Sequence, residues 1–196
     1  MAVKARPGEQ YTIRRKILKI FGAAFHVYDP NGGLVAYCKQ KAFKLKEDIR
    51  LYTSEACSEE LLVMKARSII DFGATYDITL PTGEVLASLR RKGLKSTFLK
   101  DEWLVFDHEG RQVAVLRERG RFLSFMRRYT DYGSLLAPQK FDMHLNDGTP
   151  IAMYRQHFNW FVYRLGVSIL KHDEHIDDLA ILAAGCLICA IEGRQR

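Results

Sequence analysis

Short runs of alternating hydrophobic and polar residues recur along most of the chain, and turn-forming residues separate them. Such alternation is typical of strands with one buried face. In four places the pattern G-x-x-x-A-x-x-[KR] follows a strand-like run, with the glycine in a turn-rich stretch. The four sets are Gly32, Ala36 and Lys39; Gly83, Ala87 and Arg90; Gly110, Ala114 and Arg117; and Gly148, Ala152 and Arg155. We interpret them as four β-hairpins, in which the alanine points inward and the basic residue points outward.

Further strands are predicted between the hairpins, over residues 11–19, 43–52, 61–67 and 161–170. Together with the hairpin strands they make about twelve. An antiparallel sheet of that length must close or curl, because exposed edges invite aggregation. A closed barrel of that size leaves an interior that is too wide for its own side chains to fill.

The segment that would fill the interior is the hydrophobic run 179–191, LAILAAGCLICAI. A helix that is apolar on every side must be buried all round. It would be about 20 Å long against about 30 Å of bilayer hydrocarbon, which favours a core helix over a membrane span. We predict a central helix over about 177–191, capped by Asp177 or Asp178. The structural plug consists of small side chains: Ala183, Ala184, Gly185, Cys186 and Cys189.

The predicted fold is therefore mainly β, an antiparallel closed barrel of about twelve strands around a hydrophobic C-terminal helix. The length of 196 residues fits a single domain over residues 11–196, after a flexible tail at 1–10. Four cysteines, two of them inside the apolar run, indicate reduced thiols rather than a disulfide framework. We expect a cytoplasmic protein with peripheral contact to membranes.

The residues also carry a resemblance to a known family. The stretches 16–52, 74–92 and 176–192 make the chain similar to the LURP-one-related proteins of the tubby C-terminal-like superfamily, which also contains the phospholipid scramblases. The resemblance covers residues 11–191 and implies a twelve-stranded barrel around a hydrophobic C-terminal helix. In that superfamily tubby domains bind phosphoinositides and scramblases are linked to lipid movement. No tubby phosphoinositide motif maps onto particular residues of this chain.

Basic residues are the main candidates for a binding surface, since the net charge is +7. The segment 117–132 mixes arginines with aromatic residues, which suits an anionic membrane surface. The candidate lipid- or phosphate-binding residues are Arg117, Arg119, Arg121, Arg127, Arg128, Arg90, Arg91 and Lys92. Two other readings stay open: a solvated outer sheet face whose rings pack on the barrel, and a surface for single-stranded nucleic acid, which we disfavour.

Catalytic signatures are missing from the sequence: it contains no Walker loop, dinucleotide fingerprint or nucleophile elbow. Cys186 and Cys189 form C-x-x-C, but within an apolar helix they read as core residues. The segment 172–178 holds two histidines and four carboxylates without a metal-site spacing. We therefore expect no enzyme activity, no cofactor and no metal site. The predicted function is a binding module for anionic phospholipid or phosphoinositide surfaces; the alternative is an intracellular scaffold with protein partners.

Overall fold

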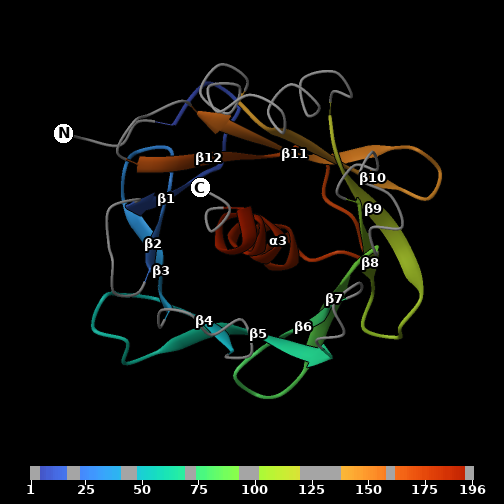
Figure 1. Ribbon diagram of the computed structural model, residues 1–196, viewed down its shortest axis with the longest axis horizontal. Helices are drawn as coiled ribbons and strands as arrows, with labels where there is room; N and C mark the ends of the chain where they lie inside the picture. Colours follow the sequence, from blue (N-terminus) through green and yellow to red (C-terminus); the bar gives the residue numbers. More distant parts are fainter. Residues whose placement is uncertain are drawn as a thin grey trace.

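A computed structural model describes residues 5–16, 23–40, 48–68, 74–92, 102–119, 138–157 and 162–192. Each strand pairs antiparallel with the next one along the chain, and β1 pairs with β12, so the twelve strands close into a barrel (Figure 1). The strands are β1 (Tyr11–Lys16), β2 (Ala23–Tyr28), β3 (Leu34–Gln40), β4 (Ile49–Tyr52), β5 (Glu60–Ser68), β6 (Thr75–Thr79), β7 (Val85–Arg91), β8 (Glu102–Phe106), β9 (Gln112–Glu118), β10 (Lys140–Leu145), β11 (Pro150–His157) and β12 (Val162–Ile169). The predicted fold class is confirmed.

The four repeated motifs form one kind of turn. Their glycines, at positions 32, 83, 110 and 148, have φ between 81° and 89°, a left-handed conformation that favours glycine. In each turn the glycine N–H donates to the carbonyl three residues earlier, and the strand register shifts just before the turn. This is a three-residue hairpin loop with a glycine bulge. The predicted hairpins are therefore confirmed as β2–β3, β6–β7, β8–β9 and β10–β11.

The alternation of the motif residues is also confirmed. Ala36, Ala87, Ala114 and Ala152 are all buried inside the barrel. Arg90, Arg117 and Arg155 are exposed on its outer face, while the side chain of Lys39 lies outside the described part of the chain. These four alanines are small, so they leave room for the central helix.

Helix α3 (Asp178–Glu192) runs through the middle of the barrel (Figure 1). Asp177 begins it as predicted, because its Oδ1 accepts a hydrogen bond from Leu179 N at 2.7 Å. Every residue from Ala180 to Ala190 is buried, including the predicted plug residues. Within the described ranges, no helix has both the length and the hydropathy needed to cross a bilayer.

Specific contacts hold the helix in place. A Cβ at Gly185 would lie 2.9 Å from Ile13 Cδ1 of β1, so the backbone of α3 lies directly against the barrel wall. The buried hydroxyl of Tyr154 donates to Ile181 O at 2.9 Å. At the C-terminal end Arg15 Nη1 donates to Cys189 O at 3.1 Å, where a cation is favoured by the helix dipole.

The N-terminal segment packs against strand β12. Gln10 exchanges hydrogen bonds with Ile169: its Nε2 donates to Ile169 O at 3.2 Å and its Oε1 accepts from Ile169 N at 2.8 Å. Glu9 is buried. The sequence predicts a flexible tail over residues 1–10, whereas in the structure Glu9 and Gln10 contact the barrel.

Candidate anionic surface

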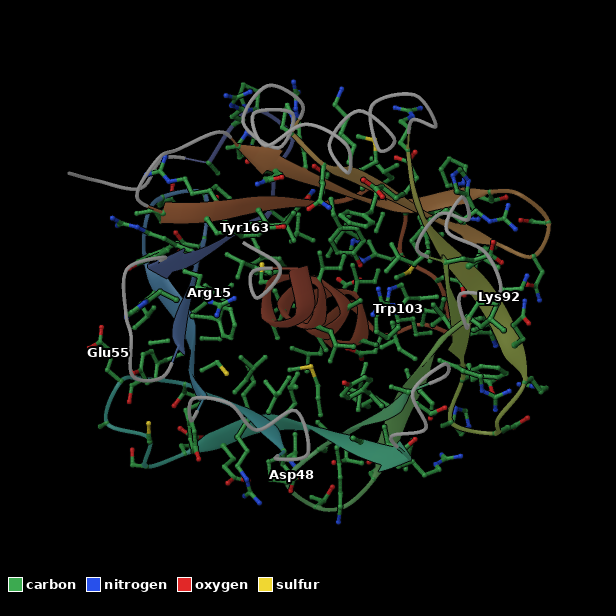
Figure 2. The ribbon with its side chains drawn as sticks, viewed as in Figure 1. Arg15, Asp48, Glu55, Lys92, Trp103 and Tyr163 are labelled. Carbon is green, nitrogen blue, oxygen red and sulfur yellow. The ribbon has the colours of Figure 1, made fainter. Side chains whose placement is uncertain are left out.

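Exposed cations cover the outer face of the barrel from β5 to β10. We call this set the basic belt: Lys65, Arg67, Arg90, Lys92, Arg117, Arg119 and Lys140. Four carboxylates lie on the strands of this part of the outer face: Glu60, Asp77, Glu102 and Asp142. In Figure 2 the labelled Lys92 lies outside the ring of strands, whereas Arg15 and Trp103 lie between the strands and α3. The belt contains four of the predicted binding residues: Arg90, Lys92, Arg117 and Arg119.

Several belt residues are paired with carboxylates. Glu102 bridges two of them, with Lys92 Nζ at 3.1 Å from Oε1 and Arg117 Nε at 3.2 Å from Oε2. Burial alone would raise the pKa of Glu102, but the hydrogen bonds from Lys92 and Arg117 outweigh it and the pKa is lowered. Arg119 Nε lies 3.1 Å from Asp142 Oδ2. These cations are organised by the sheet, and part of their charge is neutralised.

Three other belt residues form no ion pair with a described carboxylate. Arg90 stacks over the ring of Phe106, with its Cζ 4.9 Å from the ring centroid. Among the described residues, no carboxylate forms an ion pair with Arg90, Lys65 or Lys140. On the strands of this face seven cations stand against four carboxylates, and that excess favours a positive potential.

The remaining predicted residues lie elsewhere. Arg91 has the inward parity of Ala87 and Leu89, and its Cζ lies 5.8 Å from the centroid of the inward-facing Trp103 ring. It therefore does not belong to the outer face. Arg121, Arg127 and Arg128, with the part of the basic-aromatic segment that follows residue 119, lie outside the described residues.

Residues 9–190 match the family model of the LURP-one-related proteins (LOR), which covers most of the 196 residues. The chain belongs to the LURP-one-related family. Membership confirms the resemblance of the sequence. The comparison with curated proteins finds no match. The function of this LURP-one-related barrel therefore has to be argued from its own residues.

The cysteines of this LURP-one-related protein are all free thiols. Burial raises the pKa of Cys38 to about 12, and burial also raises the pKa of Cys186 and of Cys189. A thiol that stays protonated is a poor nucleophile and a poor metal ligand. The C-x-x-C pair is thus part of the core, as the sequence analysis interprets it.

The acidic segment before α3 has structural roles. His172 Nδ1 lies 2.9 Å from Asp178 Oδ2, and Asp173 Oδ1 accepts a hydrogen bond from His175 N at 3.0 Å. In the described ranges, no three His, Cys, Asp or Glu side chains converge to hold a metal ion.

One polar contact of this LURP-one-related barrel has no signal in the sequence. His157 Nε2 donates to Glu9 Oε1 at 2.6 Å, and both residues are buried although they lie on the outer side of β11 and β12. The two residues are separated by 148 positions. No motif or spacing links them, so only the barrel closure reveals the pair.

Proposed function

We propose that this protein is a non-enzymatic binding module for anionic phospholipid surfaces, phosphoinositides among them. The basic belt is the observation that carries the proposal, because seven exposed cations and only four carboxylates lie on these strands of the outer face. Each Lys or Arg near an anionic leaflet contributes about 1 kcal/mol of attraction. The resemblance of the sequence to a superfamily with lipid-binding members favours the same proposal.

Vesicle co-sedimentation across a salt series tests the proposal. The double variant Lys65→Gln/Arg90→Gln removes two cations that have no ion pair within the described residues, so it should disturb the fold little. Losing about 2 kcal/mol of attraction should weaken binding to phosphatidylserine vesicles about thirtyfold at low salt. Rising salt should weaken binding of the parent in the same way.

The matched control is Lys171→Glu, which changes the net charge by the same amount. Lys171 is exposed in the connection between β12 and α3, where its N–H donates to Ile151 O of β11, and it does not belong to the basic belt. Its variant should bind vesicles within about twofold of the parent. Equal losses in both variants would show a diffuse charge effect and contradict a belt-mediated surface. Equal binding to neutral and anionic vesicles would contradict the proposal itself.

A second candidate is a scaffold for protein partners. The ion pairs of Arg117 and Arg119 favour it, since a face of mixed charge resembles the polar rim of a protein interface. This candidate predicts no vesicle binding and capture of one stoichiometric partner, whose binding Arg119→Glu weakens.

A further inference from the structure

The outer face of β11, β12 and β1 carries a second polar cluster, which adjoins the basic belt where Lys140 pairs with Arg155. The strand register places Thr12 opposite Gly166, and Arg164 between Arg14 and His157. The side chain of Glu9 lies over Gly166 and contacts His157. We call this set the Glu9 cluster: Glu9, Thr12, Arg14, His157, Arg164 and Gly166.

The Glu9 carboxylate lies flat on strand β12. A Cβ at Gly166 would overlap the carboxyl carbon and both oxygens of Glu9, so only glycine admits the group there. Oε1 accepts a hydrogen bond from His157 Nε2 at 2.6 Å, and Oε2 accepts one from Arg6 N at 3.0 Å. Glu9 is only 8% exposed. The cluster is thus a built niche for an anion, and a carboxylate of the chain itself occupies it.

That carboxylate does not satisfy the niche. Four buried polar atoms of the cluster have no hydrogen-bond partner among the described residues. Thr12 Oγ1, Arg14 Nε and Arg164 Nε can donate to an anion, whereas the fourth, His157 Nδ1, is an acceptor in the neutral ring that donates through Nε2. Thr12 is 2% exposed and His157 9%, so water has little access to either. Buried polar groups are normally paired, and a concentration of unpaired ones on one face indicates a place for a ligand.

The charges point the same way. Arg14 and Arg164 are direct cross-strand partners, and like charges in that arrangement repel each other. Arg155, the register partner of Gly166, adds a third guanidinium. One carboxylate, with both oxygens already engaged, cannot neutralise these groups or accept from both Nε donors. A phosphate group carries more oxygens and a second negative charge, and guanidinium groups bind it well.

We infer that the Glu9 cluster is a binding site for a phosphate group, and that Glu9 is the resident carboxylate which the phosphate displaces. Arg14 and Arg164 donate to the phosphate oxygens through Nε, together with the Thr12 hydroxyl. The site goes beyond the proposed function, because it takes a single phosphate group and requires neither a membrane nor the basic belt.

Titration with inorganic phosphate at constant ionic strength tests the inference, followed by the NMR signals of the arginine Nε–H groups. Removing the competing charge with Glu9→Gln should tighten phosphate binding about tenfold. Arg164→Gln should abolish saturable binding. Lys171→Gln, the control, should bind phosphate as the parent does. If Arg164→Gln does not fold, Thr12→Val and Arg14→Gln serve in its place, each weakening phosphate binding.

Two results would overturn the site: a folded Glu9→Gln protein with no saturable phosphate binding, or binding that the changes at Arg14 and Arg164 leave untouched. Vesicles separate the two sources of the phosphate. If Glu9→Gln tightens binding to phosphatidylinositol phosphate vesicles but not to phosphatidylserine vesicles, the group belongs to a lipid headgroup; if only inorganic phosphate responds, it is a free phosphate. Lys65→Gln/Arg90→Gln should leave phosphate titration unchanged, so the proposed function of the belt and the phosphate site can be refuted separately.

Discussion

The contact between helix α3 and strand β1 at Gly185 tests directly whether the barrel encloses its helix. A Cβ at Gly185 would lie 2.9 Å from Ile13 Cδ1 and 3.3 Å from Tyr154 Cε1 and Val167 Cγ2. Alanine is favoured over glycine within a helix by about 1 kcal/mol. An extra methyl group in a filled core costs about 1–3 kcal/mol. We therefore expect Gly185→Ala to lower the free energy of unfolding by about 0–2 kcal/mol.

A double-mutant cycle isolates the contact. Ile13→Val removes the Cδ1 atom that crowds position 185, at a cost of about 0.5–1.5 kcal/mol. In the double variant the new methyl group occupies the space that Cδ1 leaves. The combined loss should therefore be smaller than the sum of the two single losses by at least about 0.5 kcal/mol.

The assay is urea unfolding of the four proteins, followed by far-UV circular dichroism and tryptophan fluorescence. Ile78→Val is the matched control, because Ile78 is also fully buried but is not among the nearest atoms to position 185. In that cycle the losses should add. Additive losses in the Ile13 cycle would refute the packing of α3 against β1. Gly185→Leu places three more carbons at this position than Gly185→Ala does, so its unfolding midpoint should lie at a clearly lower urea concentration. The same midpoint as the parent would refute enclosure of the helix.

Three other predictions concern the Tyr154 hydroxyl, the His157 ring and the cysteine thiols. Tyr154→Phe removes the hydroxyl that donates to the backbone of α3, and should lower the free energy of unfolding by about 0.5–1.5 kcal/mol in urea; no change would mean that the bond is absent in solution. Burial lowers the pKa of His157 below 6.5, against the opposing effect of the Glu9 carboxylate. The unfolded chain therefore binds a proton at His157 more tightly than the folded protein does. The contribution of His157 to the free energy of unfolding is fully present above pH 6.5, and it is lost as the pH falls through the folded-state pKa. His157→Gln should flatten this loss in urea midpoints measured against pH, and parallel slopes would contradict it. Cys57, which is partly exposed, should react with iodoacetamide at neutral pH, while Cys38 and the two helix cysteines should react only in denaturant, as mass spectrometry of labelled peptides would reveal.

Most of the barrel could be predicted from the sequence because its local signals agree with one another. The glycine of each repeat marks a turn that requires positive φ, and the alanine four residues later marks the inner face. The apolar run before Glu192 has no polar side, so only an enclosed position suits it. Turn chemistry, strand period and helix composition thus lead to one architecture.

The candidate sites were less predictable, because they depend on which strands meet. Arg90 and Arg91 are neighbours in the sequence but lie on opposite faces: the motif predicts that Arg90 points outward, yet both residues are candidates for the binding surface, and the register with Trp103 places Arg91 inside. The pairing of Glu9 with His157 arises from contacts of the N-terminal segment with β11 and β12. Local patterns carry no information about contacts of that sequence separation.

The position of α3 in the chain has a consequence for biosynthesis. The helix follows all twelve strands, yet it occupies the space that they surround (Figure 1). While the strands are being synthesised, inward residues such as Ile13 and Val167 have no helix to pack against, and β1 must wait for β12 before the ring can close. Contacts of such long sequence separation slow folding and leave apolar surface exposed in the meantime. No N-terminal portion can close the ring ahead of the rest, so we expect the nascent chain to expose apolar surface until α3 has emerged from the ribosome.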